Sequence, residues 1–99
     1  MKKRLSEEDC INWWLAKYHN TTLDQVKKDH PEWMEDPQKH TTDFYETYAV
    51  TQEQHDEWDE WYIRAFAKDF HISIKYARKA SRMSWLNVSP TVLPKGEKP

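Results

Sequence analysis

His55 and Asp59 are the residues of this sequence whose types and spacing come nearest to a metal site. They stand four positions apart, which places both side chains on one face of a helix. Zinc and other transition metals take imidazole and carboxylate ligands, but a protein site supplies three or four of them. No third ligand follows at a suitable spacing, and the His-Glu-x-x-His arrangement is absent. The sequence therefore predicts no metal site and no cofactor.

Residues with the chemistry of catalysis are present, but they are not arranged as a known catalytic group. Cys10 could act as a nucleophile only beside a base, and its spacing from His19 matches no nucleophile signature. We expect Cys10 to fill space at the edge of the first helix instead. Neighbouring acids such as Asp56 and Glu60 are explained by a solvated helix face. The sequence therefore predicts a protein that is not an enzyme.

The chain has one glycine and one cysteine, and both counts exclude classes of protein. The tight turns of P-loops, dinucleotide-binding fingerprints and nucleophile elbows need glycine, and the one available, Gly96, lies near the end of the sequence. A single cysteine cannot form an internal disulfide, which favours a reducing compartment. The basic first residues lead into acids without the apolar stretch of a signal peptide, and no run is long enough to span a membrane. We expect a soluble protein of the cytoplasm, the host cytoplasm if the protein is viral.

Charge is unevenly distributed along the sequence. The formal net charge is only −2, but residues 5–60 carry 15 acids and 4 bases. Residues 61–99 carry 2 acids and 8 bases, so an acidic first part precedes a basic second part. An acidic surface favours a positively charged partner and repels nucleic acid.

Three segments have the form of a capping box, in which a Ser or Thr N-cap is followed three positions later by Asp, Glu or Gln. Their first residues are Ser6, Thr22 and Thr51. After the first box, apolar residues at helical spacing predict a helix that Asn20 can close in the left-handed conformation. After the second, a short helix must stop before Pro31. The third box begins the longest helix, which extends to about Phe70.

The remaining segments complete an all-α prediction. Residues 30–40 contain two prolines and are predicted to form a loop anchored by Trp33 and Met34. A short helix is expected over 42–48, and Ser73 is a natural N-cap for a last helix that runs to about Leu86. We predict a compact bundle of about five helices that ends in a helix-turn-helix-like hairpin. Residues 1–89 form a single helical domain in this interpretation, and residues 90–99 form a C-terminal tail that contains Pro and Lys.

Aromatic residues replace the aliphatic side chains that the sequence lacks. Only 37% of the residues are hydrophobic, but 14 of the 99 are aromatic and six of these are Trp. Large rings can build the core of a small domain, so most of the Trp residues are expected to be buried. Three of them fall off the clearest apolar stripes, and Trp is enriched at the energetic centres of protein interfaces. The protein-interface candidates are Trp13, Trp33 and Trp61.

Residues 66–82 resemble the helix-turn-helix motif of phage repressors. The segment has a small residue early in its first helix, apolar residues before and after the turn, and two apolar positions in its second helix. These positions are Ala67, Phe70, Ile72, Ala77 and Ala80. The family's turn glycine is His71 here, and His can adopt a positive φ.

The resemblance implies that the second helix of this hairpin contacts DNA with its outer face. The candidate contacts are Ser73, Lys75, Arg78, Lys79 and Arg82. The same basic face could instead contact a protein partner or neutralise the acidic first part of the chain. The acids of residues 5–60 weigh against DNA, because phosphate contacts dominate the affinity for it.

Residues 43–55 look like segments of small accessory proteins carried by bacteriophages. This likeness implies a compact protein that acts by binding host or viral machinery, and it identifies no site. Our leading hypothesis is a non-enzymatic phage accessory factor that binds and modulates a host protein, for instance as an inhibitor, with acidic residues 5–60 and Trp anchors. The alternative is a helix-turn-helix transcriptional regulator that binds duplex DNA. Both hypotheses leave the oligomeric state open.

Overall fold

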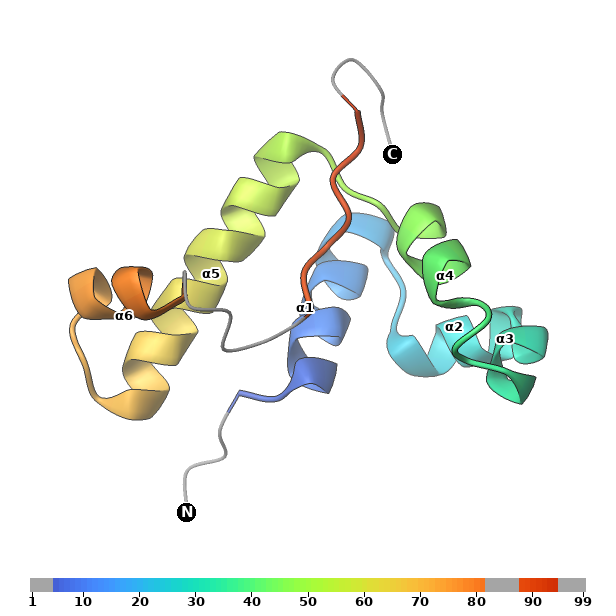
Figure 1. Cartoon of the computed structure of the whole chain (residues 1–99), viewed down its shortest axis with the longest axis horizontal. Coiled ribbons are helices and arrows are strands. Elements are labelled where there is room, and N and C mark those ends of the chain that lie inside the picture. The colour runs from blue at the N-terminus through green and yellow to red at the C-terminus, as the bar shows by residue number, and fades with distance from the viewer. Residues whose placement is uncertain (1–4, 82–87, 95–99) are drawn as a thin grey trace.

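The structure, a computed structural model, describes residues 5–81 and 88–94 of the 99-residue chain (Figure 1). Within these residues there are six helices and no strand, which confirms the predicted all-α fold. The helices are α1 (Glu7–His19), α2 (Leu23–Asp29), α3 (Pro31–Glu35), α4 (Thr41–Thr47), α5 (Gln52–Phe70) and α6 (Ile74–Ser81). In this described part, each helix is too short or too polar to cross a membrane.

The predicted N-caps are present, and two of the three are full capping boxes. The side chains of Ser6 and Thr51 each accept a hydrogen bond from the backbone N–H three positions on, and each box is closed by the reciprocal bond. Thr22 caps α2 by accepting from the N–H of Gln25 at 3.1 Å. The amide of Gln25, however, donates to the carboxylate of Asp29 one turn further on, at 2.9 Å. The Gln25 side chain is therefore directed along α2 toward Asp29, and the predicted second box is a simple N-cap.

The segment predicted as a loop over residues 30–40 contains the short helix α3, so that prediction was wrong in part. Pro31 stands in the first turn of α3, where its missing N–H has no helical partner to lose. It therefore begins a helix here rather than only ending the previous one. Trp33 is 7% exposed and anchors this helix in the core, whereas Met34 is 43% exposed and does not.

The long helix α5 is the centre of the molecule and packs between α1 and α6 (Figure 1). It contributes Trp58, Tyr62, Ile63, Phe66 and Ala67 to the core. From α1 come Cys10, Trp14 and Leu15, and from α6 the small residues Ala77 and Ala80. These side chains form one hydrophobic cluster that extends to α2 and α3, and no polar or charged residue of the described ranges is buried.

The turn between α5 and α6 has the backbone that the sequence predicts. His71 is the C-cap of α5 with φ 54°, and Asn20 closes α1 with φ 51°. Ser73 accepts from the N–H of Tyr76 at 3.1 Å, as an N-cap of α6 should. The predicted extension of this last helix to Leu86 lies outside the described residues.

The chain from Val88 to Pro94 forms no helix and runs toward the connection between α4 and α5 (Figure 1). Val50, which follows α4, donates its N–H to the carbonyl of Thr91 at 2.9 Å and accepts from the N–H of Leu93 at 2.8 Å. Val50 and Val92 thereby form an isolated parallel bridge. Within the segment predicted as a tail, residues 91–93 are thus paired with the connection between α4 and α5.

Candidate functional site

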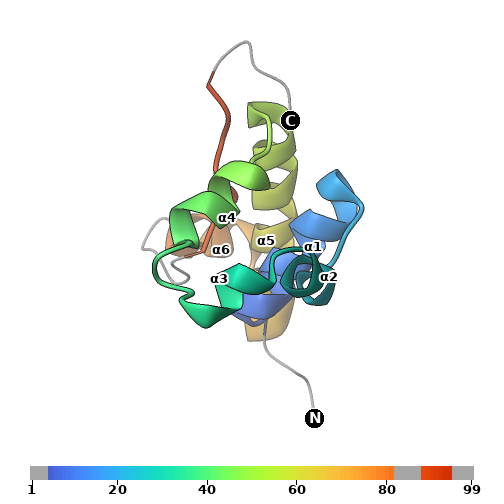
Figure 2. The same cartoon turned by 90° about the vertical axis from the view of Figure 1, so that its right-hand side faces the viewer.

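A groove of about 260 Å³ opens between α1, α3 and α4. Helices α3 and α4 lie at the end of the molecule away from α6 (Figures 1 and 2). Seven of the groove's ten lining residues are apolar or aromatic, and three are polar. We call it the α1–α3–α4 groove. The lining residues are Glu7, Ile11, Leu23, Trp33, Met34, Pro37, His40, Thr41, Phe44 and Tyr45.

Aromatic contacts hold the groove's α4 wall in place. Helix α4 has no buried residue, so its position depends on rings that are half-buried. Phe44 and Tyr45 lie 6.2 and 6.0 Å from the fully buried ring of Trp14, measured between centroids. Trp33 meets Phe44 edge to face at 6.2 Å. Because these rings cover the core on one side only, their outer surfaces remain available in the groove.

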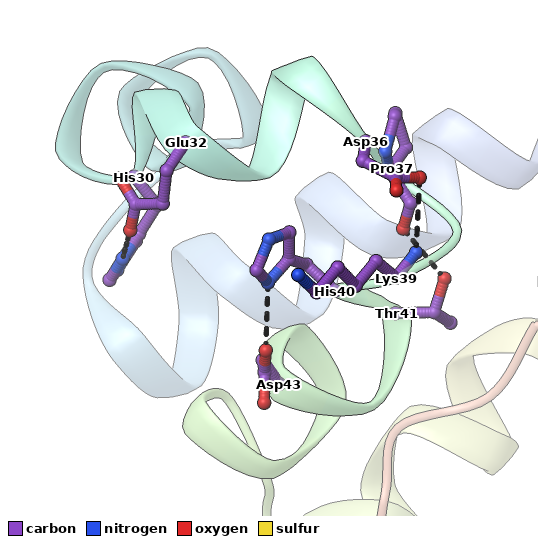
Figure 3. A network of polar contacts seen from close by, with 8 residues as sticks. All are labelled: His30, Glu32, Asp36, Pro37, Lys39, His40, Thr41 and Asp43. Atoms are coloured by element: carbon purple, nitrogen blue, oxygen red, sulfur yellow. Dashed lines mark hydrogen bonds and ion pairs between the residues drawn. The ribbon is translucent and has the colours of Figure 1, made fainter.

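Polar contacts in the connection between α3 and α4 set the spacing of the two helices (Figure 3). The hydroxyl of Thr41 donates to the carbonyl of Pro37 at 3.0 Å. His40 Nδ1 lies 2.9 Å from a carboxylate oxygen of Asp43, one turn into α4. His30, before α3, stacks on Trp33 with 3.9 Å between ring centroids and planes 6° apart. The contacts of Thr41 and His40 hold the turn between α3 and α4, and Pro37, His40 and Thr41 of this turn line the α1–α3–α4 groove.

The surroundings of the groove are acidic. The first turn of α1 carries Glu7, Glu8 and Asp9. Residues 31–47, which form α3, α4 and their connection, contain five acids and the single base Lys39. All of these five acids are exposed: Glu32, Glu35, Asp36, Asp43 and Glu46. A positively charged partner is therefore favoured at this end of the molecule.

The three Trp interface candidates are placed in two different ways. Trp33 is buried and presents only part of its ring to the groove, so its role at an interface stays a prediction. Its off-stripe position reflects the separate short helix α3, which was not expected. Trp13 and Trp61 are half-buried and stack on each other at 4.7 Å between centroids. Lys17 Nζ lies 5.1 Å from the Trp13 ring centroid, a cation–π contact.

The described contact candidates of the last hairpin lie on α6 or at its N-cap, and two of them, Ser73 and Arg78, have structural roles. The hydroxyl of Ser73 caps α6. Arg78 donates to both carboxylate oxygens of Glu60 on α5, at 3.1 and 3.3 Å, and Arg64 donates to the same carboxylate at 3.2 Å. Arg78 thus fastens α6 to α5. The remaining described candidates, Lys75 and Lys79, are exposed, and Arg82 lies outside the described residues.

The residues considered for metal binding and catalysis are used otherwise. His55 Nε2 lies 3.1 Å from the hydroxyl of Ser89, and nowhere in residues 5–81 and 88–94 do three His, Cys, Asp or Glu gather closely enough for a metal ion. His19 Nε2 lies 2.9 Å from the carbonyl of Tyr48. Cys10 is fully buried, and burial together with Asp9 and Glu7 raises the pKa of its thiol to about 12. This thiol stays protonated and is a poor nucleophile at neutral pH.

The groove itself was not predicted from the sequence. Ile11, Phe44 and Tyr45 stand at apolar positions of predicted helices, and helical spacing shows which residues share a face but not how completely that face is covered. The one signal in the sequence was the combination of Trp33, Met34 and two prolines within an acidic stretch. That pattern indicates apolar side chains held close to the surface.

A scan against protein-family models, a search of curated proteins and a search of solved structures each returned no match for this chain. The resemblance of residues 66–82 to phage-repressor motifs and the likeness of residues 43–55 to phage accessory proteins therefore stay predictions.

Proposed function

We propose that this protein is a non-enzymatic binding protein that captures a positively charged segment of another protein in the α1–α3–α4 groove. The observation that carries the proposal is an apolar groove of about 260 Å³ within the acidic part of the chain. Its aromatic wall provides affinity for one large apolar side chain of the partner. The acids around it attract and orient Lys or Arg residues on either side of that anchor.

The charge of the surface favours a protein over a nucleic acid at this site. Phosphates would meet the five acids of residues 31–47 with only Lys39 in compensation. The more specific hypothesis is a phage accessory factor that modulates a host protein in the host cytoplasm. It is supported by the likeness of residues 43–55 to such proteins, and by the reducing compartment that a single buried cysteine favours.

DNA binding through α6 is the second candidate function. The observation in its favour is that Lys75 and Lys79 are exposed on α6, with the 61% exposed Tyr76 beside them. The ion pairs of Glu60 with Arg78 and Arg64 weigh against it, since they neutralise part of the basic face. We therefore rank this function second.

Selection from a displayed library of random peptides on the immobilised full-length protein tests the first proposal. We expect enriched peptides to carry one large apolar residue flanked by Lys or Arg. A synthetic peptide of the enriched sequence is then titrated against the parent and two variants. Met34→Lys places a positive charge in the groove, and Ala16→Lys places the same charge on an exposed position of α1 that does not line it.

We expect Met34→Lys to weaken peptide binding by about tenfold or more, which corresponds to about 1.4 kcal/mol. Ala16→Lys should change the affinity by less than about threefold, because it alters only the long-range field. The proposal is wrong if no basic peptide is enriched, or if both variants weaken binding equally.

A further inference from the structure

We propose that the α1–α3–α4 groove also accepts helix α6 of a second copy of this chain, so that the protein associates with itself head to tail. This inference rests on the proposed use of the groove as a binding site, and it adds an occupant that is present in the same molecule. The argument comes from the outer surface of α6, from charge, and from the distance between the two surfaces.

The outer face of α6 has the chemistry that the groove favours. Large apolar side chains are exposed at three described positions, namely Met34 in the groove and Ile74 and Tyr76 on α6, with 42% and 61% of the latter two accessible. At about 100° per residue, Lys75, Lys79 and Tyr76 follow one another around the helix within about 100° of arc. Ala77 and Ala80 occupy the opposite, buried side. Tyr76 is thus a large side chain at one edge of the basic face, with both lysines on the same side of it.

The charges of the two surfaces are complementary. Helix α6 contains three bases and no acid, whereas residues 31–47 contain one base and five acids. Arg78 is held by Glu60 within its own chain, so Lys75 and Lys79 are the exposed cations of α6 that can face the acids of a second copy. Opposite charges across the contact would steer the copies together and fix their orientation.

Tyr76 fits the groove by shape and by polarity. A groove of about 260 Å³ walled by Trp33, Phe44 and Tyr45 provides aromatic surfaces for one further ring, which rings prefer to meet edge to face or in offset stacks. A buried tyrosine also needs a hydrogen-bond partner for its hydroxyl. Glu7, His40 and Thr41 in the lining can supply one.

The contact has to be between molecules. Helix α6 lies at one end of the long axis of the molecule, and α3 and α4 lie at the other (Figures 1 and 2). The extent along that axis is 41 Å, so α6 cannot reach its own groove. A contact between two different surfaces is heterologous. Each added copy uses one of its two surfaces, so an open assembly always keeps a free groove at one end and a free α6 at the other. The association therefore continues past the dimer unless it closes into a ring.

Sedimentation of the full chain over a range of concentrations tests this inference, with three variants. Met34→Lys alters the groove and leaves α6 intact, and the double variant Lys75→Glu with Lys79→Glu alters α6 and leaves the groove intact. Ala16→Lys is the control. We expect the mass of the parent to rise with concentration and to fall back at high salt, because salt screens the charge contacts. Each of the first two variants should be monomeric, and Ala16→Lys should behave as the parent.

The decisive sample is the equimolar mixture of the groove variant and the α6 variant. One partner supplies an intact α6 and the other an intact groove, so the mixture should form 1:1 dimers that do not grow further. Formation of these dimers also shows that both variants are folded. The inference is overturned if the parent is monomeric throughout, if either variant alone associates as the parent does, or if the mixture stays monomeric.

This result can be separated from the outcome of the peptide selection. Binding of a basic peptide by a chain that remains monomeric would overturn only the self-association. Dimers in the mixture without any enriched peptide would overturn the capture of other proteins and retain the second copy as the occupant of the groove.

Discussion

The indole rings of Trp13 and Trp61 stack on each other with 4.7 Å between their centroids and 16° between their planes. Each ring lies off the main apolar stripe of its own helix, and each is covered by the other. The same side of the molecule holds an ion pair between Lys17 and Glu57. Trp13 and Trp61 thus join α1 to α5 at the edge of the core, against which both rings pack.

The stacked rings of Trp13 and Trp61 should stabilise the folded state cooperatively, so that each ring contributes more when the other is present. We expect the double-mutant cycle of Trp13→Ala and Trp61→Ala to give a coupling free energy of about 0.5–1.5 kcal/mol, because the rings are in direct contact. Urea unfolding of the parent, both single variants and the double variant measures it. Trp13→Ala combined with the distant Tyr76→Ala should be additive. Additive losses for the stacked pair itself would contradict this prediction.

Trp14 should be among the most costly residues to truncate. Its ring is fully buried and contacts Phe44 and Tyr45 of the groove wall. Trp14→Ala is expected to lower the free energy of unfolding by about 3–5 kcal/mol, as large core truncations do. Met34→Ala, at an exposed position of the groove, should stay within about 0.5 kcal/mol of the parent. Chemical denaturation compares the two variants, and similar losses would show that the core assignment is wrong.

Replacing His71 by glycine should stabilise the protein. His71 has φ 54°, and the left-handed region costs a residue with a Cβ about 1–2 kcal/mol relative to glycine. Part of this gain is offset, because glycine has more freedom in the unfolded chain. Asn20, with φ 51°, tolerates this region better, so Asn20→Gly should gain less. Thermal melts of the parent and both variants should rank His71→Gly above Asn20→Gly in melting temperature. A melting temperature of His71→Gly below that of the parent would contradict this prediction.

Stability should decrease at alkaline pH, in part because of Cys10. Burial, with Asp9 and Glu7 nearby, raises the pKa of this thiol from 9.0 to about 12. A raised pKa means that the folded state holds its proton more tightly than the unfolded state. The contribution of the protonated Cys10 thiol to the free energy of unfolding is therefore complete below pH 9 and is lost as the pH rises toward 12. Urea unfolding across this window should show a smaller decrease for Cys10→Ala than for the parent; equal decreases would contradict the assignment.

Duplex DNA should bind weakly or not at all. Glu60 neutralises part of the basic face through Arg78 and Arg64, and the acidic first part of the chain repels phosphate. We expect no retention on duplex DNA at moderate salt. If the parent does bind, the joint change of Lys75, Arg78, Lys79 and Arg82 to Ala should abolish it. Tight, salt-dependent binding by the parent that this change removes would instead favour the helix-turn-helix function.

Local structure could be predicted from the sequence because its determinants lie within a few residues of one another. The boxes at Ser6 and Thr51 each depend on a side chain three positions away, and the left-handed caps at Asn20 and His71 depend on one residue each. Helical spacing showed which faces are apolar. These signals fixed the all-α class and most helix boundaries before any packing was known.

Contacts between helices were decided only by the tertiary structure. Pro31 can end one helix or begin another, and in the structure α2 ends just before it and α3, whose Trp33 is buried, begins at it. In the sequence Arg78 belongs to a basic helix face. In the structure its guanidinium donates to Glu60, 18 positions away. The lining of the α1–α3–α4 groove runs from Glu7 to Tyr45 across four helices. Periodicity identifies a face but not its neighbour, because which surfaces meet depends on how all the side chains fill the core together.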